Sequence, residues 1–235
     1  MPSRIRLCLL LLSAVVFSAA RVSAQSTAPP TDTFRAGLKS FTIPAPSSEL
    51  VEPGSDYRVL LEPLAANTNR LIAGFITSDE LNALRSSAGT QLKRYALVEV
   101  PRRAEFTEVT PEIFKQVVES VGAQFGASID ANLKDQEAEV NRRIKDLGAS
   151  KTVTLEKPVQ LGAFFTKPDA ASYGMVMPIT VDGVAKKVAM SMIVIRIQQR
   201  MLFLYVFDEY KDESSVQWVR ATGEHWTDAT LQANK

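Results

Sequence analysis

Cysteine and histidine are nearly absent from this chain of 235 residues, which contains one of each, Cys8 and His225. Cys8 lies in an N-terminal segment that we expect to be removed, so the mature protein has no thiol for catalysis, disulfides or metal binding. A single histidine cannot supply the two imidazole ligands of an HExxH zinc site. Thiol chemistry and such zinc sites are therefore excluded, and stability must come from packing.

The sequence also lacks short motifs that mark several enzyme classes. It contains no GxxxxGK phosphate loop, no GxGxxG dinucleotide motif and no GxSxG elbow to expose a nucleophilic serine. We therefore expect no nucleotide-dependent chemistry. His225 stands beside Trp226 in the last predicted helix, where a half-buried or exposed histidine is expected rather than a catalytic base.

Neither sign of charge dominates the chain. The formal net charge is +1, and loss of Arg4, Arg6 and Arg21 with the N-terminal segment leaves 24 basic against 26 acidic residues, or −2. This balance gives no global electrostatic reason to expect nucleic acid or an anionic membrane as a partner. Apolar residues make up 46% and charged residues 23%, which is the ordinary globular range and allows one substantial core.

The first 24 residues have the order of a signal peptide. Arg4 and Arg6 precede an apolar run at 7–17, and the sequence VSA that ends at Ala24 has the small-x-small pattern of a cleavage site. The run is too short to favour a spanning helix, which needs about 20 residues. We predict a periplasmic or secreted protein cleaved near Ala24, and the alternative is a retained leader that tethers the protein to a membrane.

The rest of the chain divides into a linker and one domain. Residues 25–38 are rich in Ser, Thr and Pro and are expected to form a disordered linker. Residues 39–235 are expected to form a single α+β domain. Its first half is predicted to contain short strands at 41–43, 57–61, 71–76 and 94–101, of which the first two form a hairpin.

A long helix is the clearest element of the domain. Thr110 is the expected N-cap and Pro111 occupies the first helical position, after which apolar residues recur at three- and four-residue steps as far as Leu147. Gly122 and Gly126 allow a kink or close packing near the middle.

Four strands, at 159–166, 173–181, 187–197 and 201–207, follow with short connections and predict an antiparallel meander. Asp182-Gly183 suits a two-residue turn in which both residues have positive φ. The run 201–207 does not alternate, so both its faces should be covered, one by the long helix and one by a helix at 212–234. We predict an α+β fold with a mainly antiparallel sheet, a C-terminal four-stranded meander, and these two helices as covers.

Four methionines are predicted to share one face of the meander. A two-residue turn pairs Met175 with Met190, so Met175, Met177, Met190 and Met192 point to the same side. Thioethers commonly fill irregular cores, so packing beneath a helix is the favoured interpretation. The functional alternatives are a groove for an apolar ligand, such as a lipid or peptide, and a Cu(I) site.

Four carboxylates, Asp208, Glu209, Asp212 and Glu213, stand between the buried strand and the last helix. They are candidates for a calcium or magnesium site or for a general acid and base pair, although the glycine and spacing of a calcium loop are missing. A helix N-terminus presents unpaired amide donors and the positive end of a dipole. Capping and surface charge are therefore the favoured interpretation.

The C-terminal segments resemble a known family. A strand, a tight turn, RMLFLYVFDEY and a closing helix with SVQWVRATGEHWTDATLQAN are similar to the C-terminal half of PsbP-like exported domains. The resemblance implies an α/β/α sandwich, in which helices cover an antiparallel sheet on two sides, and an accessory or binding role without catalytic residues. The opening FTIPAPSSEL lacks the tryptophan expected there.

We therefore expect an exported, non-enzymatic binding or accessory protein without a cofactor, whose partner is an unknown apolar ligand or another protein. One alternative is a hydrolase that uses the carboxylates around Asp208 and Asp212, with a divalent ion. Another is a membrane-tethered module whose charged helical segment, 134–146, binds a partner protein. Nucleic acid is not an expected partner.

Overall fold

The computed structural model describes residues 33–235 except 59, 87–90, 126 and 147–151, with residues 127–132 described by their backbone alone. The predicted signal peptide and most of the predicted linker lie outside the described residues. The end of that linker instead forms strand β1 (Thr33–Ala36), which pairs with β2 (Lys39–Thr42) in a two-stranded sheet. Phe34 of β1 is buried, so the folded domain includes residues that the sequence placed in the linker.

An eight-stranded sheet forms the centre of the molecule, and all its strand pairs are antiparallel. The strand order is β3-β4-β5-β10-β9-β8-β6, and β7 also pairs with β8. The strands are β3 (Leu50–Val51), β4 (Asn69–Thr77), β5 (Arg94–Pro101), β6 (Val153–Leu155), β7 (Val159–Lys167), β8 (Ala170–Val181), β9 (Val184–Ile197) and β10 (Arg200–Glu209). The last four strands form the predicted meander.

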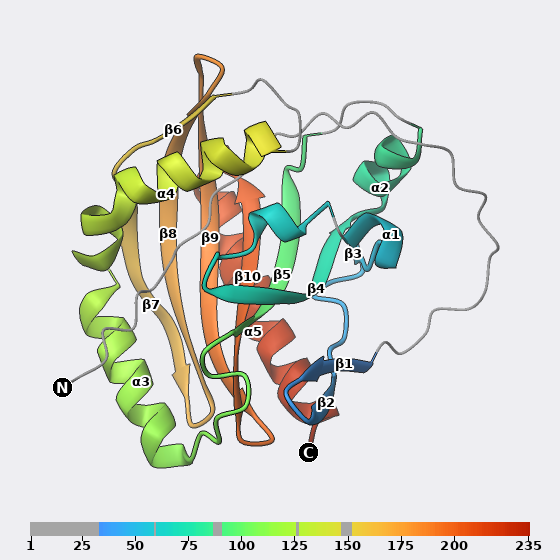
Figure 1. Ribbon diagram of the computed structural model, residues 1–235, viewed down its shortest axis with the longest axis vertical. Coiled ribbons are helices and arrows are strands. Elements are labelled where there is room, and N and C mark those ends of the chain that lie inside the picture. The colour runs from blue at the N-terminus through green and yellow to red at the C-terminus, as the bar shows by residue number, and fades with distance from the viewer. Residues whose placement is uncertain (1–32, 59, 87–90, 126, 147–151) are drawn as a thin grey trace.

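Helices cover both faces of this sheet (Figure 1). α3 (Pro111–Gln124) and α4 (Ala127–Asp146) lie on one face, and α5 (Glu213–Ala233) lies on the other. The α+β prediction is therefore confirmed, although the predicted long helix is divided in two. Three short helices join β3, β4 and β5: α1 (Ser55–Arg58), η1 (Glu62–Leu64) and α2 (Ser78–Arg85). No helix in the described part of the chain is long and apolar enough to cross a membrane.

The sheet separates two hydrophobic cores. In β10, Met201, Phe203, Tyr205 and Phe207 belong to the core beneath α3 and α4, and Leu202, Leu204 and Val206 belong to the core beneath α5. All seven side chains are at most 7% exposed. Both faces of the strand are covered, which explains why its sequence does not alternate.

Two tight turns connect the long strands. Asp182 and Gly183 have φ angles of 50° and 80°, as predicted for the β8–β9 turn. The β9–β10 turn uses Gln198 and Gln199, with φ angles of 45° and 64°, without the glycine that usually marks such a turn. The carbonyl oxygen of Gln199 accepts a hydrogen bond from the amide of Val109 at 2.8 Å, which ties this turn to the segment before α3.

The strand predicted at 57–61 does not form. Instead α1 (Ser55–Arg58) is closed by the amides of its last two residues, which donate to the carbonyl of Gly54 at 3.2 and 2.9 Å. Leu61 is still buried, and it packs so closely over Gly74 that a Cβ there would lie 2.4 Å from the leucine Cδ1. Its apolar character therefore reflects a core contact, and β2 pairs with β1 rather than with this segment.

Candidate functional site

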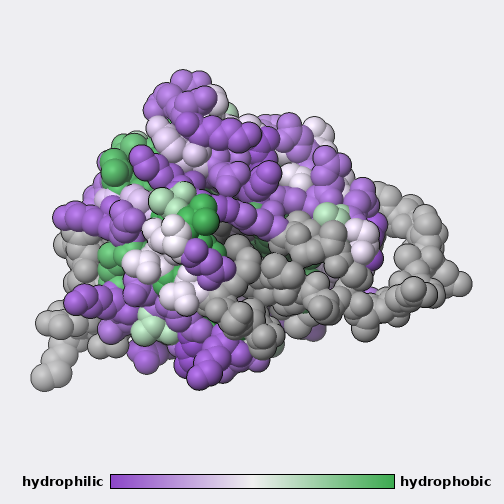
Figure 2. Space-filling model, turned by 90° about the horizontal axis from the view of Figure 1, so that it is seen from above, coloured by the Kyte–Doolittle hydropathy of each residue, from purple (hydrophilic) through white to green (hydrophobic). Residues whose placement is uncertain are grey.

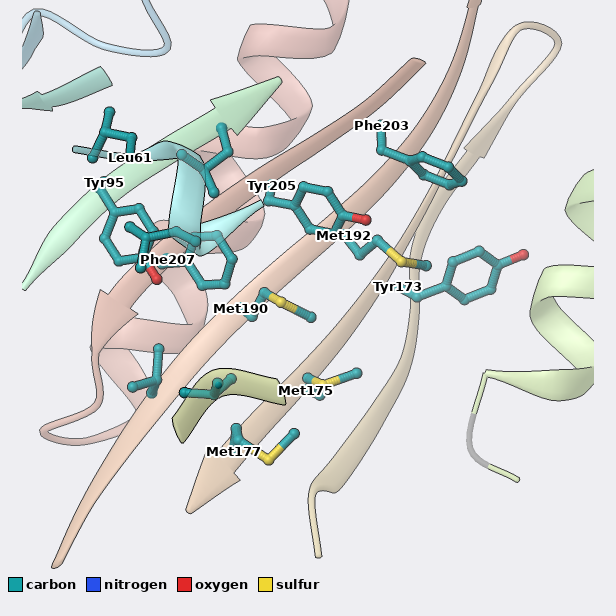
Figure 3. Close-up of a cluster of buried hydrophobic side chains, with 14 of the residues drawn as sticks. Leu61, Tyr95, Tyr173, Met175, Met177, Met190, Met192, Phe203, Tyr205 and Phe207 are labelled. Atoms are coloured by element: carbon teal, nitrogen blue, oxygen red, sulfur yellow. The ribbon is translucent and has the colours of Figure 1, made fainter. Parts of the chain in front are cut away.

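The four methionines are brought together as predicted, and they lie inside the core beneath α3 and α4 (Figure 3). Met175 is opposite Met190 in the β8–β9 pair, and Met192 is opposite Tyr173. The side chains of Met175, Met177, Met190 and Met192 are at most 3% exposed. Aromatic side chains of the same core lie beside Met190 and Met192, and thioethers pack well against ring edges. This burial favours core packing, because none of the four side chains reaches the surface.

The carboxylates at the end of β10 have separate partners. Asp208 accepts hydrogen bonds from Nε and Nη2 of Arg94 at 3.1 and 3.3 Å, and the Arg94 guanidinium lies 4.1 Å from the ring centroid of Trp218. Glu209 lies 3.9 Å from the ammonium of Lys186. Asp208 is thus part of a contact between β5, β10 and α5 rather than an open site.

The two acids of α5 are placed as helix-start residues. Asp212 is the N-cap, and its Oδ1 accepts a hydrogen bond from the amide of Ser214 at 2.8 Å. Hydrogen bonds from the hydroxyl and the amide of Ser214 lower the pKa of Asp212. Glu213 occupies the first turn. Within the described ranges, no three His, Cys, Asp or Glu side chains gather as a metal ion would require, and His225 is exposed on α5.

A hollow of about 900 Å³ lies between the β1–β2 hairpin, the loop that follows it, α1 and β4, and we call it the hairpin pocket. Its apolar wall contains Phe34, Ile43, Pro44, Leu50, Val51 and Phe75. Arg58 and Arg85 also line it, together with Glu52. Small-molecule sites typically have this size, a mainly apolar wall and a few charged groups. Sequence reasoning missed this site because its residues come from separate segments without a shared motif.

The last helix holds two walls of the hairpin pocket in place. Trp226 donates from Nε1 to the carbonyl of Pro44 at 2.7 Å, and its ring meets Phe75 edge-on with centroids 5.6 Å apart. At the end of α5, Asn234 donates to the carbonyl of Thr42 at 2.7 Å and accepts from the amide of Thr42 at 2.9 Å. Because these contacts join the two ends of the domain, the pocket depends on the complete fold.

The charged groups of the hairpin pocket leave room for an anion. Arg58 lies 3.8 Å from Glu52 and donates to the carbonyl of Ile72 at 3.5 Å, and both contacts use Nη1. The guanidinium of Arg85 lies 5.9 Å from the ring centroid of Tyr57. A guanidinium has five N–H donors in a planar fork that suits carboxylate and phosphate. The weak pairing of Arg58 therefore leaves donors that an acidic ligand group could use.

A second hollow, of about 570 Å³, lies between η1, the start of β4 and the last turns of α4, and we call it the polar cleft. Its charged residues are Arg70, Arg102, Arg142, Arg143, Glu62, Glu139 and Asp146. Glu139 accepts hydrogen bonds of 2.7 Å from both Arg142 and Arg143, and the bond from Arg142 is the main reason that its pKa is lowered to about 2. Much of the charge in this cleft is therefore already compensated.

Glu99 of β5 is fully buried beside the polar cleft. Its Oε2 accepts hydrogen bonds from Nδ2 of Asn69 at 2.8 Å and from the amide of Ala66 at 3.4 Å, and both partners line the cleft. Burial raises the pKa of Glu99 to about 7, although these two bonds and the charge of Arg143 favour the ionised form. The sequence offers one sign of this buried acid, because Glu99 is the only acidic residue in the apolar run RYALVEVP. That run was interpreted only as a strand.

No family model matches the chain, and no curated protein matches its sequence. Solved structures similar to it include a mutant of the protein Mog1, with 10% identity, a TM-score of 0.32 and coverage of 86% of this chain and 93% of that one. They also include the Saccharomyces cerevisiae Ran-binding protein Mog1p, with 8% identity, a TM-score of 0.31 and coverage of 83% and 87%. Scores this low carry no argument about function.

Proposed function

We propose that the chain is an exported, non-enzymatic binding protein whose ligand is an amphipathic molecule with an apolar body and an anionic group. The hairpin pocket carries this proposal, because it combines an apolar wall with two guanidinium groups in one hollow of about 900 Å³. Burial of apolar surface contributes about 25 cal/mol per Å². Charge-assisted hydrogen bonds from Arg58 or Arg85 then select and orient the anionic end.

The two rival functions draw less support from the described contacts. A hydrolase based on Asp208 and Asp212 needs reactive carboxylates, but the first is bonded to Arg94 and the second caps α5. A docking helix at 134–146 needs free surface charge. Arg142 there is bonded to Glu139 and Asp146 within the same helix.

Dodecanoate tests the proposed ligand class, with dodecyltrimethylammonium as a probe of the same apolar length and opposite charge. Isothermal titration should show dodecanoate binding and little or no binding of the cation. We expect Arg58→Met and Arg85→Met each to weaken dodecanoate binding by about tenfold to a hundredfold, because a charge-assisted hydrogen bond contributes about 1.5–3 kcal/mol.

Arg142→Met is the matched control, because it removes the same group from the polar cleft. It should leave dodecanoate binding unchanged. The proposal fails if dodecanoate does not bind, if both amphiphiles bind equally, or if only Arg142→Met weakens binding.

Export is tested separately by determining the N-terminus of the protein recovered from its natural host. Cleavage near Ala24 predicts a chain that begins close to Gln25 and fractionates away from the membranes. A chain that keeps residues 1–24 and sediments with the membranes would favour the tethered alternative.

A further inference from the structure

Two large apolar side chains stand exposed on adjacent loops at one end of the molecule. Leu38, in the β1–β2 turn, is 78% exposed, and Phe106, in the loop after β5, is 68% exposed. The loops are in contact, because a Cβ on Gly37 would lie 2.6 Å from the carbonyl oxygen of Glu105 and 3.3 Å from the ring of Phe106. We call Leu38, Phe106 and the exposed basic residues in and beside these two loops the apolar tip.

A polar clamp fixes the two loops to each other. The amide of Gly37 donates to Oε1 of Glu105 at 3.1 Å. Arg70 pairs with both oxygens of Glu105, and its Nη2 also donates to the carbonyl of Arg35 at 2.9 Å. The hydrogen bond from Arg70 lowers the pKa of Glu105, so the carboxylate stays ionised and the clamp persists around neutral pH. Leu38 and Phe106 are therefore presented on a fixed backbone.

Positive charge surrounds this apolar pair. Four basic residues in or beside the two loops are exposed. Arg35 and Lys39 lie in β1 and β2 next to the turn, and Arg102 and Arg103 lie in the loop after β5, where Arg102 also lines the polar cleft. The acids in the same segments are Glu105, whose charge is compensated by Arg70, and Glu108. The opposite end of the molecule, which carries α4 and the β8–β9 turn, is mainly hydrophilic when seen from above (Figure 2). The apolar tip thus combines exposed apolar side chains with local positive charge, which the nearly neutral net charge of the chain does not predict.

We propose that the apolar tip docks the protein on an anionic membrane surface. Leu38 and Phe106 enter the boundary between headgroups and acyl chains, and the four basic residues meet the lipid phosphates. Apolar insertion and electrostatic attraction to anionic lipids act together in this mode of membrane binding. Leu38 and Phe106 do not line the hairpin pocket. Membrane docking by the apolar tip is therefore tested independently of ligand binding in that pocket.

Vesicle sedimentation with the full chain provides the test. The wild type should bind vesicles that contain phosphatidylglycerol more tightly than vesicles of phosphatidylcholine alone, and salt should weaken the binding. Leu38→Ser/Phe106→Ser should reduce binding roughly tenfold or more, because two exposed apolar side chains lose their transfer energy. Both residues are exposed, so the fold should be retained. Val184→Ser is the matched control, since Val184 is 58% exposed and begins β9 directly after the β8–β9 turn, at the other end of the molecule.

A second measurement reports contact of the tip itself, even if residues 1–24 hold the chain on the vesicle. Brominated phospholipids should quench the emission added by Phe106→Trp and leave that added by Val184→Trp unaffected. Equal quenching of the two variants, or unchanged vesicle binding of the double variant without selective quenching, would overturn the proposal. Absence of vesicle binding together with reduced self-association of the double variant would assign the tip to a protein contact instead.

Discussion

The pKa of Glu99 is set by the residues that surround it in the folded protein. Asn69 of β4 and the amide of Ala66 bond to one of its oxygens, Arg143 of α4 supplies a positive charge, and Tyr95 lies on the same strand. Burial outweighs these stabilising contacts and raises the pKa of Glu99 to about 7. A glutamate that would ionise near 4.5 in the unfolded chain therefore keeps its proton to much higher pH in the folded protein.

This difference predicts that the protein loses stability as the pH rises from about 4.5 to about 7. In that window the folded state binds more protons than the unfolded state, so the free energy of unfolding falls with pH, by up to about 3 kcal/mol, and levels off above it. Glu99→Gln keeps an acceptor for Asn69 but cannot ionise, so it should remove this part of the decline. Urea unfolding at pH 5 and pH 8 measures the difference.

Glu108→Gln, on an exposed loop, controls for the loss of one carboxylate and should keep the wild-type difference between the two pH values. If Glu99→Gln also keeps that difference, Glu99 does not carry the pH dependence of stability.

Among the elements, α5 depends on a cap that the sequence predicted. Asp212→Ala removes the acceptor for the amide of Ser214, and we expect the Tm to fall by about 2–4 °C. Asp212→Asn should stay close to the wild type, because asparagine caps as well as aspartate. Glu213→Ala, one position later, should have a smaller effect. Thermal unfolding followed by circular dichroism distinguishes these variants, and equal losses for Asn and Ala at position 212 would show that charge, rather than capping, matters there.

Elements with local signals were predicted correctly, and elements that depend on distant contacts were not. The conformations of the Asp182-Gly183 turn and of the Thr110 cap are determined by a few adjacent residues, and both form as expected. Leu61 illustrates the opposite case, because its apolar neighbours resembled a strand while its burial comes from Gly74 in β4. β1 was not predicted for a similar reason. It is stabilised by pairing with β2 and by the core that buries Phe34, and neither contact is visible in its own sequence.

At the scale of the whole molecule, the candidate sites were the least predictable feature. The methionine register follows from one turn and was predicted correctly. The hairpin pocket instead brings Phe34, Leu50, Phe75 and Arg85 together from four separate segments. Their proximity depends on α5, whose Trp226 and Asn234 hold the hairpin and its following loop from the other end of the chain. No periodicity or motif in the sequence predicts that these residues lie close together.

The shared sheet predicts that the two cores unfold as one unit. Each central strand contributes alternate side chains to both cores, so losing the α3/α4 core exposes the same strands that support α5. Trp226 is fully buried in the α5 core, whereas Trp218 lies beneath the guanidinium of Arg94. In a Trp218→Phe variant, the fluorescence of Trp226 should therefore report the α5 core, and far-UV circular dichroism reports all helices. We expect both probes to give the same urea midpoint, and an earlier circular dichroism transition would show that α3 and α4 detach while the α5 core remains folded.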